Sequence, residues 1–311
     1  MTFKVALRWV CTHVWKPYCR LVDRCAVVLV ITVIVVYYAV VGLGGLLTRE
    51  ERVCSETAHD FQVEYTITGH AFTVGILANY AELDKRLGES NADLERQLVF
   101  YAQAPDAYKY RYMAFPAPQL KLLHNPTEAK RLLRVLHALH GMRGEALQKR
   151  RDHLRKALIW HLHSDEAKSN PEPWKIGLLL HAYADTFSHT CTFCDQETAY
   201  GPVLGHVYWP SADKIGKYPE KFKRYTKTTL SALTLDDTGA EKLDRLLSRI
   251  DEIARDGGSE ADIRAYLGAE YAKTGYTIGA QECRDWNQLL RGQDVSAFLG
   301  DVIRTDWPDL P

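Results

Sequence analysis

The chain has 311 residues, of which 46% are hydrophobic and 25% are charged, as is usual for a folded globular protein. Its 39 lysines and arginines are balanced by 39 aspartates and glutamates. A formal net charge of zero excludes the overall positive field that is typical of nucleic-acid-binding proteins.

An uncharged apolar segment occupies residues 26–47. As a helix its 22 residues would span about 33 Å, which is enough to cross the hydrocarbon core of a bilayer. A buried core element would be shorter and less uniform, and a cleaved signal peptide would show a small-x-small cleavage site before Thr48, which is not evident. The segment therefore predicts a transmembrane helix.

Charges on the two sides of this segment predict its orientation. Residues 1–25 carry five basic side chains and one acid, whereas residues 49–52 carry two of each sign. The positive-inside rule therefore places residues 1–25 in the cytoplasm and residues 48–311 outside it. Four cysteines on the outer side could pair in an oxidising compartment, and their pairing is left open. They are Cys54, Cys191, Cys194 and Cys283.

Residues 48–311 predict one helical domain. Helical patterns cover residues 69–87, 91–103, 127–141, 144–163, 174–189, 239–255 and 259–272. Residues 195–220 are rich in glycine, proline and aromatic residues and predict a long loop. Strand alternation and internal repeats are not evident, so we expect an all-α fold.

In the helix predicted over residues 174–189, the sequence LLLHAYADTFSH places His181, Asp185 and His189 at steps of four. Such steps bring side chains to one helix face. The outer two lie about 12 Å apart along the axis, so they cannot easily share an ion. The spacing suits two neighbouring ions with Asp185 between them, or one ion and a histidine that supports a ligand. A polar stripe without metal is the alternative.

Other candidate ligands occur elsewhere in the chain. His70 begins a predicted helix, Asp106 follows Pro105 in a loop, and His206 lies in the sequence LGHVYWPSAD. Each one taken singly has an ordinary explanation, as a residue near a helix cap, a turn former or a surface histidine. His137 and His140, like His161 and His163, share their segments with many arginines and lysines, which favours a solvated face.

Four segments, taken together, resemble the zinc-dependent phospholipase C and P1 nuclease superfamily, and more closely an uncharacterised bacterial branch of it. They are GHAFTVGILANYAEL, LVFYAQAPD, GLLLHAYADTFSH and GHVYWPSAD, in the order of that branch. The resemblance covers roughly residues 58–235, and its most specific part is the H-x3-D pair. It implies a helical bundle of the phospholipase C type.

The resemblance also implies roles for individual residues. His181 and Asp185 match the H-x3-D pair, whose aspartate contacts two metals, and His70 matches an early helix ligand. Asp106 matches a loop carboxylate that is a metal ligand and a base for the attacking water. His189 and His206 match ligands of a further ion or residues that support one. His124 matches a family ligand that follows the loop aspartate, but the local sequence match is weaker.

Two departures from the family lower the expected number of ions. The secreted phospholipases bind a metal through their N-terminal amine, but here residues 26–47 precede the domain. The later helix that carries H-x3-E is also not evident. We therefore expect two zinc ions, or another divalent transition metal, rather than three.

These observations lead to the hypothesis of a metal-dependent phosphoesterase that hydrolyses a phosphodiester by metal-activated water. Its anchor would lie in the bacterial inner membrane with the domain on the periplasmic or other extracytoplasmic side. Because the anchor holds the site near lipid, we expect a phospholipid substrate before a nucleic acid. Asp106 and Asp185 are the expected catalytic residues.

Two other functions fit the sequence. One is a non-enzymatic helical membrane protein whose polar residues form a structural metal site or a buried network used in partner binding. Clustering of four or more predicted ligands around an open pocket would favour the enzyme over this alternative. The other is an HD-type phosphohydrolase, for which His59-Asp60 is the only adjacent pair, and it lies near the membrane segment.

Overall fold

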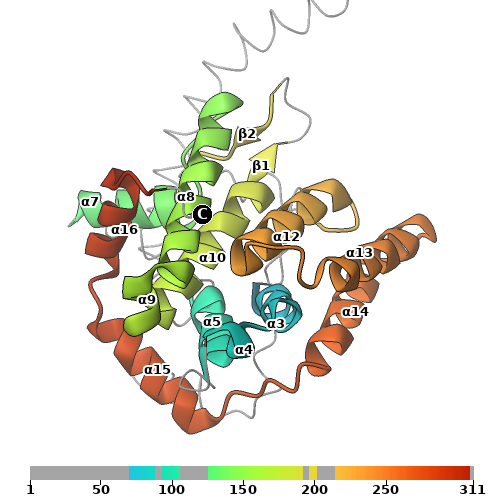
Figure 1. Ribbon diagram of the computed structural model, residues 1–311. Coiled ribbons are helices and arrows are strands. Elements are labelled where there is room, and N and C mark those ends of the chain that lie inside the picture. The colour runs from blue at the N-terminus through green and yellow to red at the C-terminus, as the bar shows by residue number, and fades with distance from the viewer. Residues whose placement is uncertain (1–69, 88–92, 106–124, 192–195, 202–213, 309–311) are drawn as a thin grey trace, which may run out of the picture. The chain divides into compact units, whose positions relative to one another are not determined.

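The computed structural model describes residues 70–87, 93–105, 125–191, 196–201 and 214–308. Within these ranges the chain is mostly helical, so the prediction of an all-α fold is confirmed at this level (Figure 1). No helix among these residues is long and apolar enough to cross a membrane. The predicted transmembrane helix at residues 26–47 lies outside the described ranges.

The first predicted helix, residues 69–87, is interrupted. Helix α3 (His70–Ala81) and helix α4 (Leu83–Leu87) are separated by Glu82, whose φ of 51° lies in the left-handed region and breaks the helical ladder. Helix α5 (Leu94–Gln103) follows and packs on α3. Its end at Gln103 agrees with the predicted helix over residues 91–103.

The segment predicted as a helix over residues 127–141 is also irregular. Helix α7 (Pro126–Arg131) is capped by the Asn125 side chain, which accepts a hydrogen bond from the Glu128 amide. It continues as a π-helix (Leu132–Leu136) that ends at His137. Such short π-helical insertions change which face the following side chains occupy.

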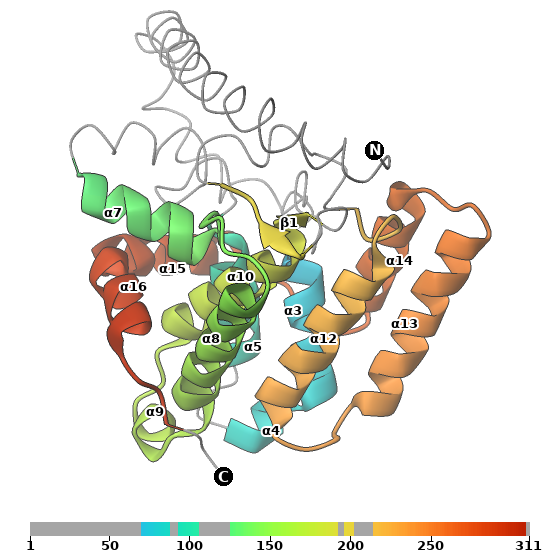
Figure 2. The same ribbon diagram turned by 90° about the horizontal axis from the view of Figure 1, so that it is seen from above.

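Helix α10 (Pro173–Ser188) is the central helix. It is buried on nearly all sides and lies against α5, α3, helix α8 (Glu145–His163) and helix α12 (Pro219–Thr234) (Figure 2). Gly177 permits the close approach of α5, because a Cβ at this position would lie 3.0 Å from the Ala102 amide nitrogen. The short helix α9 (Asp165–Ser169) connects α8 to α10.

A short hairpin follows α10. Strand β1 (Thr190–Cys191) pairs antiparallel with β2 (Thr198–Ala199), with Thr190 opposite Ala199. The predicted loop over residues 195–220 is therefore wrong at both ends, since β2 lies within it and α12 begins at Pro219.

The remaining helices form two outer groups. Helices α13 and α14 lie beside α12 and α3, whereas α15 and α16 lie beside α5, α7 and α8 (Figures 1 and 2). Both groups pack against the same hydrophobic core as α10. Their bounds are α13 (Ala240–Arg255), α14 (Glu260–Ala272), α15 (Ala280–Gly292) and α16 (Val295–Arg304).

Candidate metal centre

Asp185 lies on α10 at the centre of a buried group of histidines. Its Oδ1 is 3.2 Å from His70 Nε2. Its Oδ2 is 3.3 Å from His181 Nε2, 3.5 Å from His137 Nδ1 and 3.4 Å from His189 Nδ1. All five side chains are buried, and His137 and His181 have no solvent-exposed area. Four imidazoles thus surround one carboxylate away from water.

Distances within this group match those of a metal site. His181 Nε2 and His137 Nδ1 are 3.3 Å apart, and they lie 3.3 Å and 3.5 Å from Asp185 Oδ2. Tetrahedral zinc with bonds of about 2.0–2.2 Å has ligand atoms about 3.3–3.6 Å from one another. The three atoms therefore have the spacing of three corners of such a site. Ligand atoms of His70, His181 and Asp185 also lie within 4.8 Å of one another.

The hydrogen bonds of His181 determine which ring nitrogen faces Asp185. Its Nδ1 lies 2.8 Å from the Ala102 carbonyl, which only accepts hydrogen bonds, so Nδ1 carries the proton. In the neutral ring, the lone pair of Nε2 then faces Asp185 Oδ2, which is also an acceptor. Among the described residues this buried oxygen receives no hydrogen bond of good geometry. A bound metal ion would remove the mismatch.

Electrostatics keep Asp185 in its ligand form. Burial alone would raise the pKa of its carboxyl group. The neighbouring imidazoles of His189 and His181 outweigh burial and hold this pKa well below its usual value. Asp185 is therefore an anion at neutral pH, as a metal ligand must be.

Four separate segments supply the histidines. His70 is the first residue of α3, His137 follows the π-helix, and His181 lies on α10. His189 caps the C-terminal end of α10, and its Nδ1 donates a hydrogen bond to the His137 carbonyl at 2.8 Å. The rings of His70 and His137 lie 4.3 Å and 5.1 Å from that of His181, measured between centroids. The cluster thus depends on the packing of α3 and the π-helix against α10.

Four of the six predicted ligands meet in this cluster. They are His70, His181, Asp185 and His189. Asp106 and His206 lie outside the described residues, as do His124 and the adjacent pair His59-Asp60.

His137 is buried, contrary to the prediction from the sequence. The prediction of a solvated face for this histidine is wrong, because it is completely buried and contacts both His181 and Asp185. The π-helix turns the side chain away from the face that a regular helix would give it. The apolar run LLRVL immediately before it was the available signal. His161 and His163 are half-buried rather than solvated, and His161 packs against Phe298.

Two of the four cysteines that follow the apolar segment are disulfide-bonded, namely Cys191 in β1 and Cys283 in α15. This agrees with the prediction of disulfides rather than a zinc knuckle at Cys191. Cys54 and Cys194 lie outside the described residues.

Comparisons with known proteins identify no relative: no family model, curated protein or solved structure matches this chain. Membership of the phospholipase C and P1 nuclease superfamily therefore stays a prediction from the sequence segments.

Proposed function

We propose that this chain is a metal-dependent phosphoesterase. The observation that supports the proposal most strongly is the ring of four buried histidines around Asp185. Imidazole and carboxylate donors together suit zinc, and the distances among them suit a tetrahedral site. With zinc bound, such a site supplies a coordinated water of lowered pKa and polarises a phosphoryl oxygen.

Asp185 presents its two oxygens to different histidines, and we propose that it contributes to two ions. Its Oδ1 faces His70, whereas its Oδ2 faces His181 and His137. A carboxylate whose two oxygens face different ligands is suited to bridge two metals. In this proposal Asp106 and His206, which the sequence segments match to ligands, would help to hold the ions, and Asp106 would accept a proton from the attacking water.

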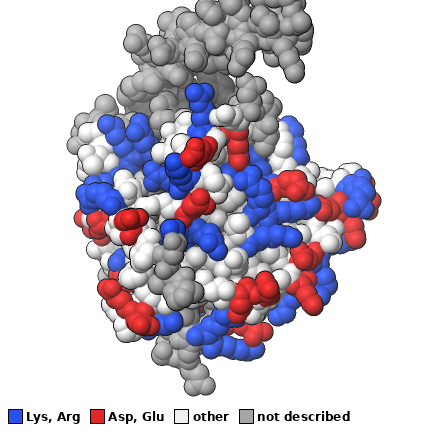
Figure 3. All heavy atoms as spheres, turned by 45° about the horizontal axis from the view of Figure 1, so that its top comes forward, with Lys and Arg blue, Asp and Glu red and all other residues white. Residues whose placement is uncertain are grey.

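We further propose that the domain acts on a lipid phosphodiester outside the bacterial cytoplasm, anchored in the inner membrane by residues 26–47. The disulfide bonds of Cys191 and Cys283 support an oxidising compartment. Lysines and arginines lie among aspartates and glutamates on the face shown in Figure 3, so this face offers no continuous basic surface for a nucleic acid.

A structural metal site used in partner binding is the second candidate function. One observation favours it, which is the complete burial of His137 and His181. Structural zinc sites are closed by protein ligands, whereas catalytic sites keep one position open to water or substrate.

Hydrolysis assays on the full chain in mild detergent distinguish these functions. The zinc-loaded protein is incubated with bis-p-nitrophenyl phosphate, phosphatidylcholine vesicles or a short oligonucleotide. Asp185→Asn removes the central ligand, and Asp244→Asn is the matched control because Asp244 forms an exposed ion pair with Lys227. We expect hydrolysis that is lost in Asp185→Asn and kept in Asp244→Asn. Folded, zinc-loaded protein that hydrolyses none of the substrates would leave the structural site as the better account.

A further inference from the structure

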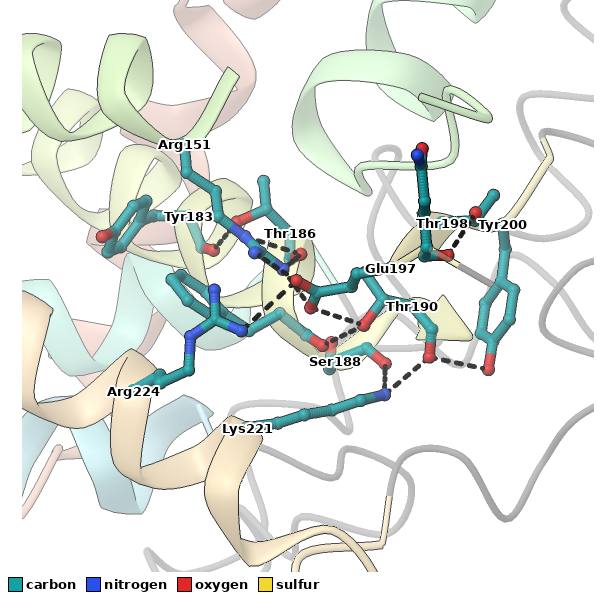
Figure 4. Close-up of polar contacts among 12 residues, drawn as sticks. Arg151, Tyr183, Thr186, Ser188, Thr190, Glu197, Thr198, Tyr200, Lys221 and Arg224 are labelled. Carbon is teal, nitrogen blue, oxygen red and sulfur yellow. Dashed lines mark hydrogen bonds and ion pairs between the residues drawn. The ribbon is translucent and has the colours of Figure 1, made fainter. Parts of the chain in front are cut away.

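The C-terminal end of α10 is buried and is held by two cationic side chains (Figure 4). Arg151 donates to the Thr186 carbonyl through Nε at 3.2 Å and Nη2 at 2.6 Å. Lys221 Nζ donates to the carbonyls of Ser188, at 3.4 Å, and Thr190, at 2.6 Å. The last carbonyls of a helix have no partner within the helix and carry partial negative charge, so cations stabilise them.

Arg151 also joins α10 to the hairpin. Its Nη1 and Nη2 lie 2.8 Å and 2.7 Å from the two carboxylate oxygens of Glu197, just before β2. The guanidinium lies over the Phe187 ring, 4.1 Å from its centroid, and Arg151 is 1% exposed. One side chain of α8 therefore contacts both the last turn of α10 and Glu197, the residue that precedes β2.

These contacts lie next to metal-centre residues. Thr186 follows Asp185 in the chain, and the His189 amide donates to the Asp185 carbonyl at 3.0 Å. The His189 carbonyl in turn accepts a hydrogen bond from the Tyr200 amide of the hairpin at 2.9 Å. His189 is thus fixed between the last turn of α10 and the hairpin, the two segments that Arg151 connects.

We propose that Arg151, through its contacts with Thr186 and Glu197, is a positioning residue that holds Asp185 and His189 in the geometry required for metal binding. This inference rests on the proposed metal centre. Arg151 touches none of the metal-binding atoms itself, and its effect is transmitted through the backbone of α10 and the hairpin.

The geometry requires an arginine at this position. Nε and Nη2 reach one carbonyl, while Nη1 and Nη2 reach both oxygens of one carboxylate. Lysine carries a single ammonium group and cannot make this planar set of contacts. Arg151→Lys therefore keeps the positive charge but loses the paired hydrogen bonds to the Thr186 carbonyl and the Glu197 carboxylate.

Arg86 provides a matched control at a distant site. It donates to the carbonyls of Ala81, at 3.0 Å, and Thr234, at 2.9 Å, and it pairs with Asp236 at 2.7 Å. It thus combines carbonyl and carboxylate contacts as Arg151 does, but it lies in α4 beside the end of α12, and its side chain is 30% exposed. Arg86→Lys tests whether any loss of such a contact weakens metal binding.

The test is cobalt titration of the metal-free full chain in mild detergent, followed by visible absorption. Cobalt(II) chloride is added to the wild type, Arg151→Lys, Glu197→Gln and Arg86→Lys, and circular dichroism verifies that each is folded. We expect Arg151→Lys and Glu197→Gln to weaken cobalt binding by about 10–100-fold and to alter the d–d bands, as loss of a group that orients a ligand does. Arg86→Lys should keep the wild-type affinity within about twofold and the same bands, because it lies away from the ligands.

Two results would overturn the positioning role. One is wild-type affinity and bands in Arg151→Lys. The other is an equal loss in Arg86→Lys, which would indicate general loosening of the fold. If Arg151→Lys does not fold, Glu197→Gln decides by the same criteria. Wild-type protein that binds no cobalt would instead refute the metal centre itself, and the positioning role with it.

Discussion

Replacing Asp185 by asparagine separates a metal site from a metal-free polar network. The amide is neutral, so the substitution removes the anion that a metal ion needs. It also removes the carboxylate whose pKa the surrounding histidines hold well below its usual value. Metal-free Asp185→Asn should therefore be less stable than metal-free wild type, and the response to zinc distinguishes the two accounts.

The size of the expected difference follows from the stabilisation that bound zinc provides. Free zinc at 1,000 times its Kd stabilises a single-site protein by about 4 kcal/mol. For a domain of this size each kcal/mol raises Tm by about 2–4 °C, so the wild type should gain about 8–16 °C. The variant should gain almost nothing. Loss of the buried His–Asp contacts should lower the stability of the metal-free variant by about 3–5 kcal/mol in either case, so the zinc-induced gain of the wild type is the quantity that reveals a metal site.

Differential scanning calorimetry of the full chain at pH 8 measures the stability of the metal-free protein in EDTA. The same scan with zinc buffered at a known free concentration measures the zinc-induced gain in Tm. Asp244→Asn is again the control and should behave as the wild type. Two results would refute this reasoning: an equal zinc-induced gain in wild type and Asp185→Asn, or no zinc-induced gain in the wild type.

Three further substitutions test parts of the structure, each by urea unfolding. Gly177→Ala should destabilise the fold by about 1–3 kcal/mol, because the new Cβ meets the α5 backbone 3.0 Å away. Burial lowers the pKa of His161 to about 4, below its unfolded value near 6.5, so the folded state is increasingly penalised as pH falls below 6.5. Relative to wild type, His161→Phe should therefore have a free energy of unfolding that is about 2 kcal/mol more favourable to the folded state at pH 5 than at pH 8. Although burial raises the pKa of Glu197, Arg151 and other partners lower it to about 2. Glu197→Gln should lower the free energy of unfolding by about 3 kcal/mol at pH 7. This loss should shrink as pH falls from 4.5 toward 2.

Each of these expectations has a contradicting result. Unchanged stability in Gly177→Ala would mean that α5 and α10 can separate freely. A benefit of His161→Phe that is equal at both pH values would mean that this histidine titrates normally. A deficit in Glu197→Gln that does not depend on pH would show that the ionised carboxylate is unimportant.

Regular helices with a clear apolar stripe were predictable from the sequence. The predictions for residues 144–163 and 259–272 differ from α8 and α14 by one residue at the N-terminal end. Helix α12 was missed because its buried face includes Thr226 and Thr229, which count as polar in a pattern but are completely buried here. The break at Glu82 depends on a single left-handed residue, which no periodicity reveals.

The His–Asp cluster was predictable where one helix carries it. The spacing of His181, Asp185 and His189 anticipated that these residues meet, although both histidines reach the same oxygen of Asp185, at 3.3 Å and 3.4 Å. That was unexpected for residues eight positions apart. It occurs because α10 ends before His189, whose backbone leaves the helical conformation. His137 could not be placed, since its position depends on the π-helix and on the packing of that segment against α10.

The most direct test of the metal centre is the metal content of the full chain, purified in mild detergent without added metal and measured by plasma mass spectrometry. We predict up to two equivalents of zinc or a similar divalent metal in the wild type and in Asp244→Asn, and almost none in folded Asp185→Asn. A folded wild type that contains no metal, and that takes up none from zinc buffers, would contradict the account.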